Sequence, residues 1–144
     1  MRGFEVAKGY QNIDLPKRST LRSAGYDIAI CEAMTLEPKA IVKAPTGIKA
    51  YMQDQEVLML YPRSSLAMKG LTIPNNVGII DADYYGNSSN DGAIFVQLYN
   101  FSDQPITLEK GERIAQGIFQ TYLKATDERP PKDVRAGGFG STGR

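Results

Sequence analysis

Short apolar runs recur along the chain, and turn-forming residues separate them. Runs that alternate or carry β-branched and aromatic residues favour strands at residues 4–7, 26–30, 40–44, 56–61, 77–80, 93–99 and 105–108. Glycine, proline and asparagine fill the intervals, as in Pro45-Thr46-Gly47 and Pro74-Asn75-Asn76. Short strands at a spacing of roughly 8–12 residues are typical of a β-sandwich or barrel. The pattern predicts one all-β domain.

Two segments do not follow this strand pattern. Residues 64–69 lack alternation and predict a short helix with Ser64 or Ser65 as its N-cap. In residues 114–123, periodicity alone favours a helix, because a helical stripe is formed by Ile114, Ala115, Ile118, Phe119, Tyr122 and Leu123. Gly117 interrupts the stripe and the neighbouring segments are β-rich, so we expect a strand there.

Composition narrows the chemistry that this domain can perform. The 144 residues carry 17 basic and 16 acidic side chains, a net charge of +1. This charge is too small to create the broad positive potential that would bind a nucleic-acid backbone. The single Cys31 excludes an internal disulfide, and the absence of histidine removes histidine-based triads and most zinc sites. Catalysis must use carboxylates, hydroxyls or a hard metal ion. With no signal peptide and no apolar run near ~18 residues, we expect a cytoplasmic protein without a membrane partner.

The last ten residues, 135–144, differ in composition from the rest of the chain. They contain four glycines, two hydroxyl side chains, two arginines and a single aromatic residue, Phe139. Such a segment has little to bury, so we expect a β domain at residues 1–134 followed by a flexible glycine-rich lid. Its backbone N–H groups, hydroxyls and guanidinium groups can converge on phosphate oxygens while Phe139 stacks on a flat ring. The alternative is a disordered terminus with no role.

A candidate general base follows the apolar run at residues 77–80. There the sequence reads Asp81-Ala82-Asp83-Tyr84, and the strand period places Asp81 and Asp83 on one face and Tyr84 on the other. A carboxylate at the end of a buried strand can be partly desolvated, which raises its basicity. The alternative is an ordinary surface turn.

Other polar segments are candidates for binding anions. Pro62-Arg63-Ser64-Ser65 follows an apolar run, so a guanidinium and two hydroxyls emerge where a strand gives way to a helix start and can hold phosphate. A capped loop is the alternative interpretation. Asp27 within Ala24-Gly25-Tyr26-Asp27-Ile28 alone favours a structural turn, while Arg113 and Gln116 are equally compatible with a solvent-facing strand.

Taken in order, five segments resemble the five motifs of the trimeric dUTPases, and together they span nearly the whole chain. They are Ala24-Gly25-Tyr26-Asp27, Pro62-Arg63-Ser64-Ser65-Leu66-Ala67, Gly78-Ile79-Ile80-Asp81-Ala82-Asp83-Tyr84, Arg113-Ile114-Ala115-Gln116 and Gly137-Gly138-Phe139-Gly140-Ser141-Thr142-Gly143. Residues 86–92 lengthen the turn after the third motif and look more like the enzymes of Gram-positive bacteria and their phages.

The resemblance implies a jelly-roll β-barrel or sandwich of the β-clip type, with at most one short helix. It also implies a homotrimer with shared active sites and Mg²⁺-dependent hydrolysis of dUTP to dUMP and pyrophosphate. Asp81 matches the carboxylate that deprotonates the water attacking the α-phosphorus, and Asp27 matches the acid that holds hydrated magnesium through water. The positions that match phosphate contacts are Arg63, Ser64, Ser65 and Gln116.

The same resemblance assigns nucleoside recognition. A β-hairpin at residues 75–80 is expected to pair its backbone, at Asn75, Gly78 and Ile80, with the uracil edge and to reject cytosine. Tyr84 matches the aromatic residue that packs under the deoxyribose and excludes a 2′-hydroxyl. Over the nucleotide, Phe139 is expected to stack on uracil while the terminal phosphates are reached by Arg135, Gly140, Ser141 and Thr142.

Some positions depart from the common family pattern. Arg135 lies one residue closer to Phe139 than in many relatives, so Arg144 is an alternative contact for the terminal phosphate. Tyr85 and Asn87 stand where many members carry arginine and an acid or glutamine. Two other functions stay open at this point: a dCTP deaminase on the same fold, and a nucleotide-sensing protein that binds a regulatory partner through residues 86–92. A longer solvent loop is the simpler interpretation of that turn.

Overall fold

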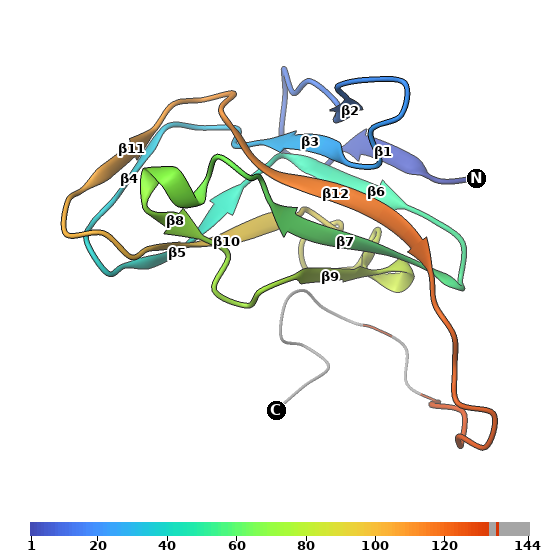
Figure 1. Ribbon diagram of the computed structural model, residues 1–144. Helices are drawn as coiled ribbons and strands as arrows, with labels where there is room; N and C mark the ends of the chain where they lie inside the picture. The colour runs from blue at the N-terminus through green and yellow to red at the C-terminus, as the bar shows by residue number, and fades with distance from the viewer. Residues whose placement is uncertain (133–134, 136–144) are drawn as a thin grey trace.

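The computed structural model describes residues 1–132 and Arg135, and the regular secondary structure in this part of the chain consists almost entirely of strands (Figure 1). The strands are β1 (Gly3–Val6), β2 (Lys17–Arg18), β3 (Tyr26–Ala29), β4 (Met34–Leu36), β5 (Ile41–Pro45), β6 (Ile48–Tyr51), β7 (Glu56–Pro62), β8 (Leu71–Thr72), β9 (Gly78–Asp81), β10 (Phe95–Asn100), β11 (Ile106–Leu108) and β12 (Arg113–Thr121). Two short 3₁₀ turns, η1 (Ala67–Lys69) and η2 (Ala82–Tyr84), complete the described elements. The all-β prediction is confirmed.

The largest sheet carries the residues of functional interest. Its antiparallel strands lie in the order β2-β3-β12-β7-β9, and Figure 1 shows β12 and β7 crossing its centre. Smaller sheets have the orders β5-β10-β8, β1-β6 and β11-β4. The N–H of Ile94 donates to the carbonyl of Ile48, which ties β6 to the segment before β10. Among the described residues, none forms a helix long and apolar enough to cross a bilayer.

One apolar core joins these sheets. The inner face of the large sheet contributes Ile28, Leu58 and Ile114, which are fully buried, and they cluster with Ala44 and Val96 of the three-stranded sheet. Burial alternates along β10, where every second side chain is buried, as expected for a strand with one face on the core. The outer face of the large sheet is therefore free to carry polar groups and exposed apolar ones.

Strand β12 confirms the expectation at residues 114–123. It pairs with β3 on one side and with β7 on the other, so it is the central strand of the large sheet. Gly117, which interrupts the helical stripe, faces the core: a Cβ there would lie 3.0 Å from Leu58 Cδ1 and 3.1 Å from Ile28 Cδ1. The glycine is required by packing across the sheet rather than by a turn.

The expected helix at residues 64–69 is reduced to the single turn η1. Its N-cap is Leu66, which has no side-chain capping bond, so the assignment of Ser64 or Ser65 as the cap was wrong. Leu66 is buried and anchors the turn in the core, and Gly70, with φ 93°, ends it by donating its N–H to Ala67. Strands β2, β4, β6 and β8 were not predicted, and β2 and β8, with two residues each, are too short to show any periodicity.

The turn at residues 86–92 is folded against the domain through Asn87 and Gly92, which are buried, while Gly86, Ser88 and Ser89 are exposed to solvent as expected of a longer loop. Asn87 is only 7% exposed, and Gly86 N–H donates to the carbonyl of Asp91. Gly92 has φ 89°, and a Cβ on it would lie 2.9 Å from Tyr85 Cα and 3.0 Å from Gly86 N. Backbone atoms surround this glycine, and they cannot rotate away as a side chain could.

Substituting Gly92→Ala should therefore destabilise the protein by about 2–3 kcal/mol, because both the positive φ and the backbone clash oppose the new Cβ. Urea denaturation measures the change. Gly86→Ala is the matched control, since Gly86 also has positive φ, 69°, but its Cβ would meet nothing within 4 Å. We expect the control to cost about half as much. Equal losses in the two variants would contradict the packing described for this turn.

Candidate functional site

Two polar clusters lie on the large sheet, one toward β3 and one at the edge strand β9. The Asp27 cluster is defined by Ser19, Asp27, Arg63, Arg113 and Gln116. The Asp81 cluster is defined by Asp81, Asp83, Tyr84 and Arg135. Between them, the two clusters contain most of the described residues that the sequence singled out.

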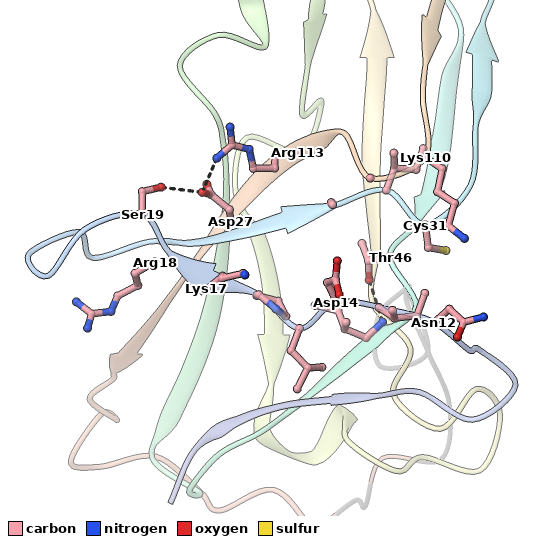
Figure 2. Close-up of a pocket in the computed structure, with 17 residues that line it drawn as sticks. Asn12, Asp14, Lys17, Arg18, Ser19, Asp27, Cys31, Thr46, Lys110 and Arg113 are labelled. Atoms are coloured by element: carbon pink, nitrogen blue, oxygen red, sulfur yellow. Dashed lines mark hydrogen bonds and ion pairs between the residues drawn. The ribbon is translucent and has the colours of Figure 1, made fainter.

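The Asp27 cluster concentrates positive charge around one carboxylate. Asp27 accepts hydrogen bonds from Ser19 Oγ at 2.9 Å and from Arg113 Nη1 at 3.2 Å, as Figure 2 shows. Arg63 Nε lies 3.6 Å from the other carboxylate oxygen. The Asp27 side chain is 17% exposed, while Arg63 and Arg113 are more accessible. Two guanidinium groups beside one carboxylate leave a local excess of positive charge that suits a phosphate group.

Gln116 joins this cluster through backbone register. It lies directly opposite Asp27 on β3, and its side-chain amide donates to the carbonyl of Pro62 at 3.4 Å. Gly25 makes room for it, because a Cβ at Gly25 would overlap Gln116 Oε1 and lie 3.0 Å from Gln116 Cβ. Gly25 therefore permits the side chain of Gln116 to lie beside the arginines.

Ser64 and Ser65 extend the cluster into the turn after β7. Both are exposed, and the turn is closed by the N–H of Leu66, which donates to the carbonyl of Arg63. The structure thus places Arg63 and both hydroxyl side chains consecutively at the end of β7. Ser19, by contrast, was not anticipated: nothing in the sequence around it distinguishes it from any other loop serine.

A cavity of about 540 Å³ opens beside the Asp27 cluster (Figure 2). Asp27 and Arg113 line it together with residues 12–19, Cys31 and Lys110. Its volume is in the range of small-molecule sites. The segment at residues 12–19 was not assigned to any site from the sequence, because its contacts with β3 arise only through the fold.

The Asp81 cluster is formed where β9 gives way to η2. Arg135 Nη2 contacts Asp81 at 2.6 Å and its Nε contacts Asp83 at 2.8 Å, so one guanidinium bridges both acids. The two carboxylates therefore lie on the same side, as predicted, although a 3₁₀ turn rather than a continued strand brings them there. The Asp81 side chain is 52% exposed in the single chain, so its carboxylate is accessible, and its expected partial desolvation stays a prediction.

Tyr84 is the buried member of the Asp81 cluster. It is 3% exposed, its hydroxyl donates to the carbonyl of Ala93 at 2.6 Å, and burial raises the pKa of its phenol. The Arg135 guanidinium carbon lies 5.9 Å from the ring centroid. One face of the ring is therefore turned toward the two carboxylates. Arg135 itself lies at this cluster and not beside the Asp27 cluster.

The segment at residues 75–80 differs from the expected hairpin. Strand β9 pairs with β7, whereas β8 before it pairs with β10, so the strands flanking this turn belong to different sheets. The turn is closed by the N–H of Asn76, which donates to Ile73, and by that of Val77, which donates to Asn75. Near Asn75 and Gly78 lies a cavity of about 20 Å³, room for roughly one water molecule and not for a base.

Strand β9 nevertheless offers backbone groups for recognition. Within the described part of the chain it pairs on one side only and forms an edge of the large sheet. An edge strand presents a row of N–H and C=O groups that are not used by the sheet. Gly78 and Ile80 both belong to this edge strand, and the backbone pairing expected of them stays a prediction.

The two clusters lie on the same sheet face but far apart within one chain. Asp27 lies opposite Gln116, which lies opposite Tyr61, and Asp81 lies opposite Val57. Tyr61 and Val57 are four residues apart on β7, so all these side chains share a face. Four residues along the strand and three strand spacings across the sheet separate the two carboxylates by ~20 Å.

A row of apolar side chains lies between the clusters. Ile118, Met59 and Ile79 face one another across β12, β7 and β9, and Ile79 is 50% exposed. Tyr61, beside this row, donates its hydroxyl to Gln120 at 3.2 Å. We call Met59, Ile79 and Ile118 the apolar row. Its position links the two polar clusters along one surface.

The described residues contain no group of three or more acidic or cysteine side chains that could hold a metal ion by themselves. Asp27 contributes a single carboxylate. Mg²⁺ keeps several of its waters and is commonly bound by one or two carboxylates together with substrate phosphates. The donor set around Asp27 therefore fits hydrated magnesium that arrives with a phosphate ligand.

The remaining candidates, Phe139, Gly140, Ser141, Thr142 and Arg144, lie outside the described residues. Their assignments stay predictions.

Comparison with known proteins identifies the family of this chain. The dUTPase family model matches residues 11–143. A deoxyuridine 5′-triphosphate nucleotidohydrolase of Lactococcus lactis subsp. lactis (strain IL1403) is 52% identical over 147 residues, which cover 99% of this chain and 98% of the relative. A protein of the same description from Chromobacterium violaceum is 41% identical over 139 residues, covering 91% of this chain and 89% of the relative.

Solved structures give the same result for the fold. The crystal structure of a dUTPase from Streptococcus mutans has a TM-score of 0.80 and 47% sequence identity with this chain. The match covers 85% of this chain and 98% of that one. The β-clip jelly roll expected from the sequence is therefore confirmed.

Proposed function

The chain belongs to the dUTPase family, and we propose that it hydrolyses dUTP to dUMP and pyrophosphate with Mg²⁺, in active sites that three copies of the chain build together. This reaction limits uracil incorporation into DNA and supplies dUMP for dTMP synthesis. One observation carries the shared site: a single chain presents two chemically complementary clusters that lie ~20 Å apart, too far for one nucleotide to use both.

The chemistry of each cluster supports this division. The Asp27 cluster has the guanidinium groups, hydroxyls and amide that suit a triphosphate. The Asp81 cluster has a general base, an edge strand and a tyrosine ring, which suit a nucleoside and its α-phosphate. A complete site therefore takes the Asp81 cluster of one chain and the Asp27 cluster of a second.

The apolar row is the surface that we assign to contact between copies. Met59, Ile79 and Ile118 lie between the two clusters, so a second copy seated on them would lie beside both. Ile79 is exposed and its two neighbours in the row are partly buried, and apolar side chains left accessible in a row on a sheet face are the kind of surface that homo-oligomers bury. A closed trimer uses this surface three times and forms three equivalent sites.

In the proposed reaction, Asp81 accepts a proton from a water molecule. The water oxygen forms a bond to the α-phosphorus while the bond from that phosphorus to the bridging oxygen breaks, and pyrophosphate leaves. Catalysis of this kind depends mainly on positioning and on neutralising charge. Asp81 can serve because its carboxylate is accessible at the end of β9 and only Arg135 contacts it among the described hydrogen-bond partners.

The phosphate half of the site positions the triphosphate. Arg63 and Arg113 offer charged donors, Gln116 offers an amide, and Ser64 and Ser65 offer hydroxyls at the end of β7. When bound, Mg²⁺ would neutralise negative charge on the triphosphate and restrict its conformation. Asp27 would hold it through water, which suits a carboxylate already engaged by Ser19 and two arginines.

Gly25→Ala tests the phosphate half. The new Cβ displaces Gln116, so we expect kcat/KM for dUTP to fall by about 10-fold, the loss of one charge-assisted contact. Steady-state kinetics measure this, with the melting temperature as a check on folding. Gln116→Ala should lose a similar factor, and adding Gly25→Ala to it should cost little more. If the double variant lost kcat/KM by the product of the two single factors, Gly25 would act independently of Gln116.

A substrate panel tests the proposed function. Purified protein with Mg²⁺ is incubated with dUTP, dCTP, dTTP and UTP while pyrophosphate and ammonia are followed separately. Pyrophosphate from dUTP alone is the expected result. Ammonia from dCTP would identify the deaminase alternative instead. An unchanged dUTP sample would refute the proposal.

The alternative of a regulatory binding protein stays a prediction. Residues 86–92 are folded around Tyr84, while Gly86, Ser88 and Ser89 are exposed. The expected cytoplasmic location stays a prediction, and so does the absence of a nucleic-acid partner.

A further inference from the structure

The turn at residues 86–92 is organised by the side chain of Asn87. Its Oδ1 accepts from the backbone N–H of Ser89 at 3.0 Å, from the Ser89 hydroxyl at 3.0 Å and from the N–H of Asn90 at 3.1 Å. Its Nδ2 donates to the carbonyl of Tyr84 at 2.7 Å and to Asn90 Oδ1 at 2.8 Å. The amide uses both its donors and its acceptor, and it is buried. Such a network specifies one conformation.

Asn90 connects this network to the hydroxyl of Tyr84. Its Nδ2 donates to Tyr84 Oη at 2.8 Å, while its Oδ1 accepts from Asn87 and, at 3.0 Å, from the N–H of Gly92. The Tyr84 hydroxyl in turn donates to the carbonyl of Ala93. Because the hydroxyl donates its only proton to the carbonyl of Ala93, it can only accept a hydrogen bond from the side chain of residue 90. The position requires a side chain that donates and accepts at once, which asparagine provides.

Contacts with other segments of the domain also hold the turn at residues 86–92 in place. Asp91 Oδ2 accepts from the backbone N–H of Lys8 at 2.9 Å and from Lys49 Nζ at 2.9 Å, and the Lys49 hydrogen bond lowers the pKa of Asp91. Tyr85 donates its hydroxyl to Glu5 at 2.6 Å, and Lys49 Nζ lies 4.7 Å from the Tyr85 ring centroid. These contacts join the turn to β1 and β6. The turn that carries Asn87 and Asn90 is therefore fixed relative to the rest of the domain.

The ring that this network holds faces the Asp81 cluster. Arg135 lies over the Tyr84 ring and contacts the two carboxylates beside it, so this face of the ring is the one that a sugar would meet in place of the guanidinium. A ring that excludes a 2′-hydroxyl by contact must stay in place to within about 1 Å, because a small displacement of the ring would make room for the hydroxyl. A buried hydroxyl with two satisfied hydrogen bonds keeps the ring from receding.

We propose that Asn87 and Asn90 are positioning residues for sugar discrimination: they fix the Tyr84 ring through its hydroxyl and its backbone, so that the site rejects ribonucleoside triphosphates. The proposal rests on the proposed function of this site. It assigns to the lengthened turn a role in substrate choice.

The test is the ratio of kcat/KM for dUTP to kcat/KM for UTP in the full-length protein. Asn90→Asp is nearly isosteric, but a carboxylate cannot donate to Tyr84 Oη. We expect it to lower the ratio by about 10-fold or more, mainly through faster UTP hydrolysis. Tyr84→Phe, which removes the hydroxyl, should lower the ratio similarly. Asn90→Asp added to Tyr84→Phe should then change the ratio little, because both act through one bond.

Asp91→Asn is the matched control. It weakens the contacts that join the turn to Lys8 and Lys49 but leaves the Asn90 to Tyr84 bond untouched. If destabilising the turn were enough, this variant would lower the ratio too, and that result would overturn the proposal. An unchanged ratio in folded Asn90→Asp and Tyr84→Phe variants would also overturn it. Wild-type protein that does not hydrolyse dUTP would refute the proposed function itself, which keeps the two failures distinct.

Discussion

Asp81→Asn is expected to lower kcat for dUTP hydrolysis by about 10³-fold while the nucleotide still binds. The amide has nearly the same shape as the carboxylate but cannot accept the proton of the attacking water. The side chain is 52% exposed at the end of an edge strand, so its replacement should leave the fold unchanged. Single-turnover kinetics with dUTP measure the chemical step, and fluorescence or calorimetric titration measures binding.

Asp83→Asn is the control for this variant. Asp83 shares the Arg135 guanidinium with Asp81 and is similarly exposed, at 59%, but it has no assigned role in proton transfer. The control should keep kcat within a few-fold of wild type. A kcat for Asp81→Asn that matches this control would remove Asp81 from the mechanism. Loss of dUTP binding by Asp81→Asn would mean that the carboxylate holds substrate and is not only the base.

Deleting residues 136–144 is expected to lower kcat/KM for dUTP by about 10²-fold or more. The segment carries the aromatic ring, hydroxyls and terminal arginine that the family resemblance assigns to covering the nucleotide. The core and both polar clusters are built from residues 1–132 and Arg135, so the melting temperature should change little. Steady-state kinetics with dUTP, alongside size-exclusion chromatography, separate loss of activity from loss of assembly.

The matched control keeps the length and composition of this segment but scrambles its order. If the motif acts through defined contacts, the scrambled protein should be as poor an enzyme as the truncated one. Activity near wild type in the scrambled protein would show that any glycine-rich extension is sufficient. A truncated protein that unfolds or dissociates would show that these residues support the structure instead.

The strand pattern was predictable where local signals were long enough to read. The strand predicted at residues 56–61 contains the continuous apolar run 57–61, and the structure forms β7 there as Glu56–Pro62. The segment at residues 114–123 was ambiguous by periodicity, and the reason for Gly117 appears only in its contacts with Leu58 and Ile28 from other strands. Strands β2 and β8 have two residues each and depend wholly on their partners.

The site shows the same division between local and long-range information. Residue types at Asp81 and Arg63 indicated candidate chemistry before the fold was known, and the family resemblance added Gln116. The separation of the two clusters could not be read from the sequence, because it depends on the order β3-β12-β7-β9 within the sheet. Likewise, no local signal marks Asn90 as a partner of the Tyr84 hydroxyl, since ordinary turn preferences already account for an asparagine there.

Subunit complementation tests the shared site most directly. Asp81→Asn and Asp27→Asn chains, each inactive alone, are co-expressed with different tags, and the assemblies carrying both tags are purified. If one chain supplies the Asp81 cluster and another the Asp27 cluster, each mixed trimer has one site of its three with both native halves, and dUTP hydrolysis returns to about a third of the wild-type level. If each chain held a whole site, every site in the mixture would lack one carboxylate. Mixed assemblies as inactive as their parents would contradict the account.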